Sequence, residues 1–495
     1  MTPNQYTPEE PISSIATALA PAALGIVRVS GKGCIELVSK VFSRPKALLE
    51  AAGNTLVYGW IQSPVVAVPE PVEGVETTGV EVPEGEVSKI DEVMLAVYRA
   101  PKSFTGEDMV EIFCHGGPAV VTAIQNLMLK IGFRQANRGE YTFRAFINGK
   151  TDLTKAEAVK EIIDSHTDAS RSHAAGRLAG SLFAEIDDIK KLIIDTLAAI
   201  EVEIEYPEDE ETIADSFDRE DIEMAARRLR ALADSWRGEK LYQDGARVVL
   251  AGRTNAGKSS LFNAILKEER AIVSDIEGTT RDWLESWASI NGIPVRLFDT
   301  AGLRETSDVI EAQGVEISRN LVHDADVVLY LVDGTQGLND EDRQFIENCQ
   351  EPLILVFTKS DKAGGTTEKA GHAELGSASQ DRPRNKFGVT ENSIHISSKT
   401  GAGLSDLFSK ITAILTAGLS TERTQAGLGS ARQKEAVSAA LESVEHALIS
   451  ADDNYTLDAV VQDLEDALDS LGEVTGDVTP DDVLGSIFAN FCVGK

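Results

Sequence analysis

Short apolar runs and longer amphipathic stretches divide this chain into regions of different kinds. In residues 1–150, strand-like runs alternate with helical spacing that predicts a helix from Pro118 to Ile131. The strand-like runs are Leu24–Val29, Val93–Tyr98 and Val110–Cys114. This mixture predicts an N-terminal α+β domain.

Residues 151–243 and 419–495 have helical periodicity instead. Apolar residues recur at helical spacing from Ala158 through Ile204, after a capping box predicted at Thr154–Glu157. Further helices are predicted at Ile222–Trp236, at Gln433–Leu471 and, opened by Pro480, at Val483–Phe491. We expect the two parts to pack together as one discontinuous helical domain.

Between these parts, residues 244–418 alternate short apolar strands with helical stretches. Near-continuous apolar runs are typical of strands buried on both faces of a mainly parallel sheet. The predicted strands are Arg247–Ala251, Val295–Phe298, Val327–Val332, Leu353–Phe357 and Ser393–Ile396. The fold class is therefore a multidomain α/β and α protein with an inserted sheet domain. Two tracts, Ser63–Ser88 and Ala363–Thr390, are predicted loop insertions to which we assign no function.

Composition and charge narrow the function classes. The chain has 495 residues and a formal net charge of −33, so on average it should repel nucleic acid. Contact with RNA would need a local basic patch or a partner. No apolar run is long enough for a membrane span, and no signal peptide is visible, which predicts a cytoplasmic protein. The four scattered cysteines favour neither zinc nor disulfides, and each is expected to be a buried free thiol.

The segment Gly252–Ser259 has the pattern G-x-x-x-x-G-K-S directly after a predicted strand. In such a P-loop the glycines let backbone N–H groups curl around phosphates, and Lys258 reaches the β- and γ-phosphates. Ser259 places its hydroxyl on Mg²⁺, and the helix that begins at Lys258 adds the positive end of its dipole. The segment therefore predicts a nucleoside triphosphate site.

Four further strings follow the P-loop along the chain. Gly278–Asp282 supplies two threonines suited to ordering around Mg²⁺ and the γ-phosphate. In Asp299–Gly302 the aspartate can hold the Mg²⁺ shell and the glycine N–H can contact the γ-phosphate. In Thr358–Asp361 the carboxylate of Asp361 can accept two hydrogen bonds from guanine, a donor pair that adenine lacks. Ser397–Lys399 follows the last strand, where backbone N–H groups could meet guanine O6.

Two positions depart from the usual pattern. Thr358 stands where GTPases of this type usually carry asparagine, so guanine affinity is expected to be weaker. Leu303 stands where many small GTPases carry a water-orienting glutamine. Another group must then position the attacking water, and the acidic candidates are Glu305, Asp308 and Glu311. A solvated surface carboxylate is the alternative for each of them.

Strings outside these motifs carry a resemblance along nearly the whole chain. They are Gly25–Gly31, Ser103–Gly117, Arg144–Lys150 and the C-terminal Phe491–Lys495. With them the chain resembles the tRNA-modification GTPase family MnmE, also called TrmE. The resemblance implies an N-terminal domain (1–150) that dimerises and is similar to folate-dependent one-carbon enzymes. It also implies a helical domain in two parts (151–243 and 419–495) and an inserted G domain (244–418).

The resemblance further implies partners and chemistry. The family forms a homodimer and works with a flavin- and NADH-dependent partner, MnmG or GidA, in a heterotetramer. Together they install an aminomethyl or carboxymethylaminomethyl group on C5 of the wobble uridine of certain tRNAs. The one-carbon donor is a tetrahydrofolate, in the 5-formyl or methylene form. Family folate contacts fall on Arg28, Glu111, Lys150 and Lys495, although ordinary surface charge is the alternative for Arg28 and Lys150. A functional C-terminal cysteine of the family falls on Cys492.

For GTP hydrolysis the resemblance implies K⁺ in place of an arginine finger, held by Asn255, Ser274, Ile276 and Thr279. Mg²⁺ would be held by Ser259 and Thr280, Glu311 would orient water, and the G domains of two protomers would meet during hydrolysis. Thr254, where the family typically has proline, should change the rigidity of the P-loop more than its contacts. The complete set of predicted nucleotide-binding residues is Asn255, Ala256, Gly257, Lys258, Ser259, Ser260, Ser274, Thr279, Thr280, Asp299, Thr300, Ala301, Gly302, Thr358, Lys359, Asp361, Ser397, Ser398 and Lys399. The predicted catalytic residues are Glu311, Lys258 and Cys492.

Two other functions remain open. A ribosome-associated assembly GTPase would be a nucleotide-switched RNA-binding module, but it would need a basic RNA-binding domain, and this acidic chain has no obvious one. A scaffold that binds GTP without hydrolysing it is disfavoured by the presence of Lys258, Ser259, Thr280 and Asp299.

Overall fold

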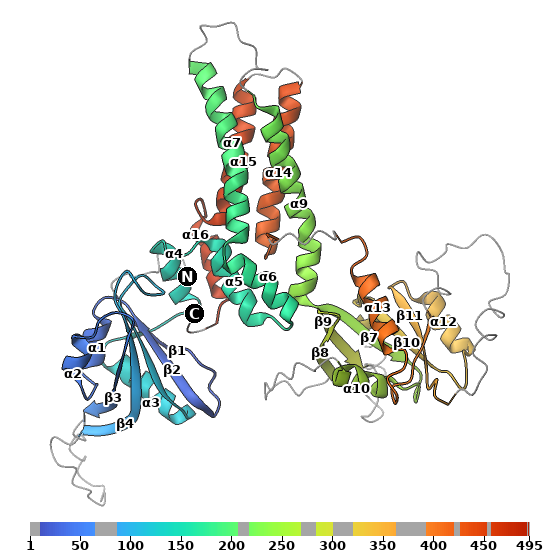
Figure 1. The fold of residues 1–495 in the computed structure, drawn as a ribbon, viewed down its shortest axis with the longest axis horizontal. Helices are drawn as coiled ribbons and strands as arrows, with labels where there is room; N and C mark the ends of the chain where they lie inside the picture. Colours follow the sequence, from blue (N-terminus) through green and yellow to red (C-terminus); the bar gives the residue numbers. More distant parts are fainter. Residues whose placement is uncertain are drawn as a thin grey trace, which may run out of the picture. The chain divides into compact units, whose positions relative to one another are not determined.

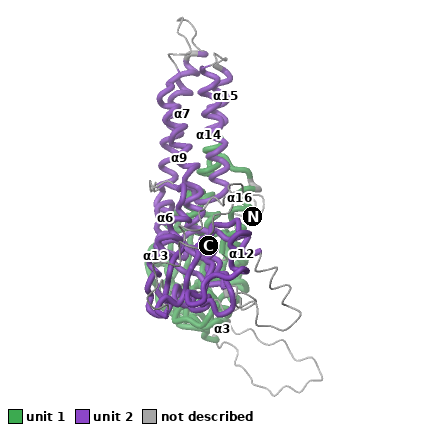
Figure 2. Tube along the Cα trace, turned by 90° about the vertical axis from the view of Figure 1, so that its right-hand side faces the viewer, with its two compact units in different colours: residues 1–160, 469–495 green, residues 161–468 purple. Residues whose placement is uncertain are grey.

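The computed structural model describes residues 10–64, 87–205, 217–268, 284–299, 320–362, 393–419, 426–452, 457–492 and 494. The chain divides into two compact units, residues 1–160 with 469–495 and residues 161–468 (Figure 2). Most of the two predicted insertions, 63–88 and 363–390, lies outside the described residues. Among the helices of the described ranges, none is both long and apolar enough to cross a membrane.

The N-terminal unit contains a six-stranded sheet with the order β3-β4-β5-β2-β1-β6. Its strands are β1 (Ile12–Ile15), β2 (Ala22–Ser30), β3 (Thr55–Pro64), β4 (Val87–Tyr98), β5 (Met109–Gly116) and β6 (Arg134–Gln135). All neighbours pair antiparallel except β1 and β6, which pair parallel. The three strand-like runs of the sequence are confirmed as parts of β2, β4 and β5. The apolar pattern does not indicate β1 and β6, because they are short and largely polar.

Helices cover one face of this sheet. They are α1 (Cys34–Ser39), α2 (Pro45–Leu49) and α3 (Pro118–Lys130), and α3 confirms the helix predicted from Pro118. Val27, Leu95 and Ile112 point into this core together with Ile124 of α3, and all four are fully buried. Burial of alternate strand residues fixes the register, because a slip of one residue would turn the apolar set to the other face.

A second layer of the N-terminal unit combines two segments that lie far apart in the sequence. α4 (Glu140–Ile147), the first part of α5 (Leu153–Asp164) and α16 (Asp481–Ala489) meet through aromatic side chains. The rings of Phe143 and Phe488 lie edge to face with centroids 5.3 Å apart. Pro480 is the N-cap of α16, as the sequence indicates, although the helix begins two residues before the predicted Val483. The C-terminal segment is thereby fixed to the N-terminal unit.

The capping box predicted at Thr154–Glu157 is wrong. Helix α5 begins at Leu153, and the carboxylate of Asp152 accepts hydrogen bonds from the Lys155 N–H at 3.0 Å and from the Thr154 hydroxyl. Thr154 is fully buried within the first turn. An aspartate two residues earlier caps the helix in its place because its carboxylate can accept several donors.

Long helices form the first part of the second unit. They are α6 (Asp168–Leu178), α7 (Ser181–Glu205), α9 (Arg219–Asp244), α14 (Ala431–Asp452) and, as far as residue 468, α15 (Leu457–Thr475). In the ribbon of Figure 1 and the Cα trace of Figure 2, α7, α9, α14 and α15 run side by side. The periodic run from Ala158 to Ile204 is divided among three helices, and Thr167 starts a new one by accepting a hydrogen bond from the Ser170 N–H. Periodicity alone does not show such a break, because both sides of it keep an apolar face.

A second sheet, with the order β12-β11-β10-β7-β9-β8, forms the rest of this unit. Its strands are β7 (Ala246–Gly252), β8 (Leu284–Ile290), β9 (Ile293–Asp299), β10 (Val327–Asp333), β11 (Leu353–Thr358) and β12 (Ser393–His395). All neighbours pair parallel except β8 and β9. Alternate residues face two separate apolar clusters, one including α10 (Lys258–Glu268) and α13 (Leu404–Leu415), the other α12 (Asp340–Asn348). The prediction of a mainly parallel sheet buried on both faces is confirmed.

A single residue joins α9 to β7. Gly245 has a φ of 70° and separates the last residue of the helix, Asp244, from the first of the strand, Ala246. A Cβ on Gly245 would lie 2.5 Å from the ring of Trp287. Both the left-handed backbone and the close ring require glycine at this joint.

Candidate nucleotide site and N-terminal polar cluster

The predicted P-loop links β7 to α10, the strand–loop–helix context that the motif requires. Gly252 and Gly257 have φ values of 136° and 96°, which side chains rarely tolerate, and Asn255 has a φ of 63°. A Cβ on Gly252 would lie 2.4 Å from the carbonyl oxygen of Leu331 on the neighbouring strand. The two glycines therefore make the backbone conformation of this loop possible.

Lys258 and Ser259 begin α10 with different partners. Nζ of Lys258 donates to the carbonyl oxygens of Gly252 at 2.7 Å and Arg253 at 2.8 Å, so the ammonium lies across the loop. The Ser259 hydroxyl donates to Oδ2 of Asp299 at 2.8 Å. Serine and aspartate oxygens are the hard ligands that Mg²⁺ prefers, so this pair fits the predicted magnesium site.

The predicted guanine loop lies at the same edge of the sheet, after β11 and β12. Oδ1 of Asp361 accepts a hydrogen bond from the Ser397 hydroxyl at 2.8 Å, so the two strings are in contact. This hydrogen bond holds the pKa of the exposed Asp361 carboxyl below its ordinary value, and the carboxylate is ready to accept donors from a base. Ser398 and Lys399 follow directly, with Lys399 exposed.

Lys359 connects this loop to the phosphate end of the site. Its Nζ donates to Oδ2 of Asp333 at 2.6 Å and to the carbonyl oxygen of Asn255 at 3.2 Å. The hydrogen bond from Lys359 is the main cause that lowers the pKa of Asp333 to about 2. Sequence reasoning missed Asp333. The sequence does indicate it, because Asp333 is an acidic residue at the carboxyl end of the otherwise apolar strand β10. Ligand-binding residues of parallel sheets collect at this end of the strands.

A second overlooked carboxylate lies beside the P-loop. Asp342 is fully buried near the start of α12, and its Oδ1 accepts a hydrogen bond from the Tyr330 hydroxyl at 2.9 Å. The Nε of Arg253, the second residue of the P-loop, lies 3.3 Å from the same oxygen. The P-loop is thus anchored to α12 as well as to the sheet.

Several predicted residues lie outside the described residues, and nothing is concluded about their positions. They are Ser274, Ile276, Thr279, Thr280, Thr300, Ala301, Gly302, Glu311 and Lys495. Of the predicted K⁺ ligands, the described ranges contain Asn255, which is exposed on the P-loop. Ala256 is buried and Ser260 is exposed on α10.

In the N-terminal unit, Arg28 and Glu111 lie opposite each other on paired strands β2 and β5. Nε and Nη2 of Arg28 donate to Oε1 of Glu111 at 2.9 and 2.6 Å, and Nη1 donates to the carbonyl oxygen of Gly494 at 2.9 Å. The guanidinium lies 5.9 Å from the ring centre of Phe104 and 5.6 Å from that of Tyr141. The hydroxyl of Tyr98 donates to the other carboxylate oxygen of Glu111 at 3.4 Å. We call Arg28, Glu111, Tyr98, Phe104 and Tyr141 the N-terminal polar cluster.

The carboxylate and the aromatic side chains of this cluster fit a folate. A carboxylate can accept hydrogen bonds from the pterin amino group and ring N–H, and aromatic faces can stack on the flat ring. Lys150 donates to the carbonyl oxygen of Pro101 at 3.0 Å, and its side chain packs beside Gly106, in the same loop as Phe104. Of the four predicted folate contacts, the structure therefore brings Arg28 and Glu111 together. It places Lys150 against the loop that contains Phe104.

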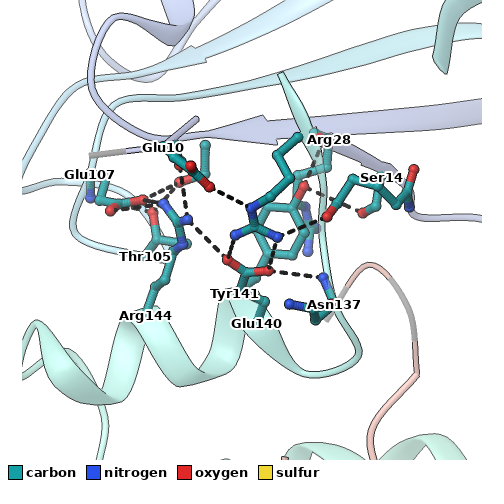
Figure 3. Close-up of polar contacts among 12 residues, drawn as sticks. Glu10, Ser14, Arg28, Thr105, Glu107, Asn137, Glu140, Tyr141 and Arg144 are labelled. Atoms are coloured by element: carbon teal, nitrogen blue, oxygen red, sulfur yellow. Dashed lines mark hydrogen bonds and ion pairs between the residues drawn. The ribbon is translucent and has the colours of Figure 1, made fainter. Parts of the chain in front are cut away.

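A buried ionic network fixes the helix that supports this cluster (Figure 3). Arg144 and Glu140 of α4 are fully buried and pair at 3.0 Å. Arg134 donates to Glu140 at 2.5 Å, and Arg144 also pairs with Glu107 at 3.1 Å. Burial acts to raise the pKa of Glu140, but the hydrogen bonds from Arg134 and the backbone of Asn137, with the charge of Arg144, lower it overall. The next residue, Tyr141, donates to the carbonyl oxygen of Arg28 at 2.7 Å, so the network and the cluster share one helix.

Comparison with known proteins assigns the chain to a family. Residues 153–492 match the family model described as MnmE helical domain, and residues 11–150 match GTP-binding protein TrmE N-terminus. The chain belongs to the MnmE family of tRNA modification GTPases. The tRNA modification GTPase MnmE of Treponema denticola is 49% identical over 99% of this chain and 99% of its own length. The MnmE of Treponema pallidum (strain Nichols) is 41% identical over the full length of both chains.

Among solved structures, a variant of Era from Aquifex aeolicus bound to GDP·AlF4− is 24% identical over 40% of this chain and 66% of its own, with a TM-score of 0.26. That score is too low to support any argument. The assignment to the MnmE family therefore rests on the sequence matches.

The cysteines of this MnmE-family chain are not all alike. Cys34, Cys114 and Cys349 are buried as expected, and burial raises the pKa of each thiol. Cys492 is exposed, so the expectation that every cysteine is a buried thiol is wrong for it. Its carbonyl oxygen accepts a long hydrogen bond, 3.5 Å, from the N–H of Gly139, which positions the backbone while the side chain faces solvent.

Proposed function

We propose that this chain is a K⁺-stimulated GTPase that modifies C5 of the wobble uridine of certain tRNAs, in the cytoplasm, with an MnmG-like flavin-dependent partner. The modification is of the aminomethyl or carboxymethylaminomethyl type, with a tetrahydrofolate as the one-carbon donor. Membership of the MnmE family supports the proposal, since its curated members are named tRNA modification GTPases. The main observation behind the proposal is that the residues predicted to bind phosphate, Mg²⁺ and guanine lie at one edge of the parallel sheet.

The chemistry proposed for the nucleotide site uses this chain's own groups. Lys258 exchanges its carbonyl partners, Gly252 and Arg253, for phosphate oxygens. Ser259 and Thr280, with Asp299 beside them in the shell, would hold Mg²⁺, which would supply positive charge next to the phosphates. Glu311 would orient the attacking water, and Asn255 with Ser274, Ile276 and Thr279 would hold K⁺.

The potassium arm is tested by rate measurements on the purified chain. GTP turnover in KCl should exceed turnover in NaCl of the same ionic strength, and equal rates would contradict the proposed role of K⁺. Glu311→Ala should keep nucleotide binding and lose most turnover. Glu268→Ala, an exposed acid at the end of α10, is the matched control and should turn over normally.

The folate arm rests on the N-terminal polar cluster. Glu111 would accept the pterin donors, Phe104 would offer an exposed ring face, and Lys150 and Lys495 would supply positive charge for the anionic glutamate tail. Cys492, exposed at the same end of the chain, is retained as a proposed participant in the modification. Titration with 5-formyl-tetrahydrofolate tests this arm, and no detectable binding would contradict it.

The homodimer is proposed to form at β3 and β4, on the face of the N-terminal sheet opposite the one that α1, α2 and α3 cover. Leu56 and Tyr58 of β3 and Met94 of β4 are exposed there by 62, 53 and 46%. Tyr58 pairs with Met94, and Met94 pairs with Phe113 of β5, so Tyr58, Met94 and Phe113 form one row across the sheet. Leu56 lies in the adjacent row, which also holds Glu111 and Arg28. An exposed apolar face of this kind marks an association surface. Met94→Glu should give a monomer in light-scattering measurements while GTP binding stays unchanged, and a persistent dimer would place the interface elsewhere.

The tRNA product is the decisive test of the whole proposal. Deletion of the gene followed by mass analysis of wobble nucleosides should show loss of the C5 modification. Return of the modification with the wild-type gene, but not with a Lys258→Ala gene, would connect it to the nucleotide site. An unchanged nucleoside profile would reject the proposal.

A further inference from the structure

Thr358 lies at the carboxyl end of β11, beneath the P-loop. Its side chain is 2% exposed, and its hydroxyl donates to the carbonyl oxygen of Ala256 at 2.8 Å. A second carbonyl oxygen, that of Val332, lies 3.3 Å away. The residue that opens the guanine loop is therefore hydrogen-bonded to the phosphate loop.

The same side chain fills the space under the next residue of the P-loop. A Cβ on Gly257 would lie 3.5 Å from both Cγ2 and Oγ1 of Thr358. Lys359, the following residue, donates to the carbonyl oxygen of Asn255. Asn255 and Ala256 of the P-loop thus accept hydrogen bonds from Lys359 and Thr358, and the Thr358 side chain occupies the space beside Gly257.

The chemistry of the side chain limits what else Thr358 can do. A hydroxyl has one proton to donate, and here two backbone carbonyls take it. An asparagine at this position would have two amide N–H donors, so one could hold the loop while the other pointed elsewhere. Guanine N7 is an acceptor and needs a donor from the protein. The hydroxyl of Thr358 has no proton left for it.

We propose that Thr358 is a positioning residue that ties the guanine loop to the phosphate loop and does not recognise the base. Base selection in this chain then rests on Asp361, whose carboxylate faces the N1 and N2 donors of guanine, and N7 is not recognised. The inference rests on the guanine-nucleotide site and is independent of the potassium, folate and flavin arms. It gives the departure from asparagine a definite consequence.

The first experiment uses the unmodified chain and two analogues, each measured in competition with a fluorescent GDP. In 7-deaza-GTP a carbon replaces N7, and ITP lacks the 2-amino group. The chain should bind 7-deaza-GTP within about twofold of GTP but bind ITP at least about tenfold more weakly. A loss of about tenfold or more with 7-deaza-GTP would overturn the proposal, since N7 would then be recognised.

The second experiment separates positioning from recognition. Thr358→Val keeps the shape but leaves the carbonyl oxygen of Ala256 without its donor, and it should weaken GTP and ITP binding by the same factor, about tenfold. Thr358→Ser retains the hydroxyl and should restore binding. Asp361→Ala should instead reduce the ratio of the GTP affinity to the ITP affinity. A change of this ratio in Thr358→Val, or an unchanged GTP affinity in that variant, would overturn the proposal.

Two controls make the outcome interpretable. Thermal melting of each variant establishes that it is folded, and if Thr358→Val does not fold, the 7-deaza-GTP comparison on the unmodified chain decides alone. Equal binding of GTP and ATP would count against the guanine site itself, a result different from every outcome that concerns Thr358.

Discussion

In the nucleotide site the cation Lys258 is bonded to backbone carbonyls, whereas in the N-terminal unit the cations Arg28 and Arg144 are bonded to carboxylates. An ammonium can leave neutral carbonyls for a phosphate without leaving an uncompensated buried charge behind. A guanidinium between buried carboxylates cannot leave at such a low cost. The difference teaches which charges of this molecule can move to a ligand and which hold the fold.

Arg144→Met should give the largest effect. The substitution leaves the fully buried carboxylate of Glu140 without one of its cations, and the free energy of unfolding should fall by about 3–5 kcal/mol. Denaturant unfolding of the full chain measures it, with the exposed Arg138→Met as the matched control. GTP affinity should stay unchanged. A loss of GTP binding with unchanged stability would reverse the roles we assign to the two kinds of cation.

Lys258→Ala should weaken GTP binding about 100-fold, since hydrogen bonds from a charged donor to the phosphates are lost. Stability should fall by less than in Arg144→Met, because the carbonyl oxygens of Gly252 and Arg253 that lose this donor are neutral. Calorimetric titration measures the affinity, and Lys267→Ala, exposed on the same helix, serves as control. Marked destabilisation by Lys258→Ala would show that this lysine holds the fold after all.

The sequence could predict the nucleotide site far better than the N-terminal polar cluster, for a physical reason. Gly252–Ser259 acts through backbone conformation and adjacent side chains, so a contiguous string carries nearly all of its geometry. Asp361 and Asp299 could be added because the carboxyl ends of parallel strands meet at one edge. Asp333 and Asp342 were missed, since neither carboxylate lies in a motif string. Each contacts a motif residue, Lys359 or Arg253, from another part of the chain.

The N-terminal polar cluster has no such string. Arg28, Glu111 and Gly494 come together through strand pairing and the docking of a C-terminal segment. Only the resemblance pointed to these positions, and ordinary surface charge was the favoured interpretation of Arg28 from its sequence alone. Helix boundaries failed for a related reason, because the cap residue Asp152 is identified by its hydrogen bonds and not by a periodic pattern.

Glu111→Gln should have a moderate effect that sharpens the comparison. The amide keeps the shape but loses the charge that Arg28 and the pterin donors require, so affinity for 5-formyl-tetrahydrofolate should fall about tenfold. GTP affinity should not change. Glu36→Gln, an exposed acid on α1, is the control. Unaltered folate binding would assign the Arg28–Glu111 pair to the fold alone.

The smallest expected effect concerns pH. Asp333 has a folded-state pKa of about 2, below the value of about 3.9 for an unfolded aspartate, so its contribution to stability is present above about pH 4. That contribution is lost as the pH falls from about 4 toward 2. The stability difference between the unmodified chain and Asp333→Asn should therefore shrink as the pH falls through this window. Denaturation midpoints at several pH values measure it, and a constant difference would contradict the low pKa.

The single-residue joint at Gly245 has a mechanical consequence. Helix α9 has 26 residues and ends there, and β7 starts at the next residue and leads after seven residues into the P-loop. A helix of that length is a rod of about 39 Å, so a rotation of about 10° about the joint sweeps its far end through about 7 Å. Any rotation about Gly245 would therefore be transmitted between α9 and the strand that carries the phosphate loop.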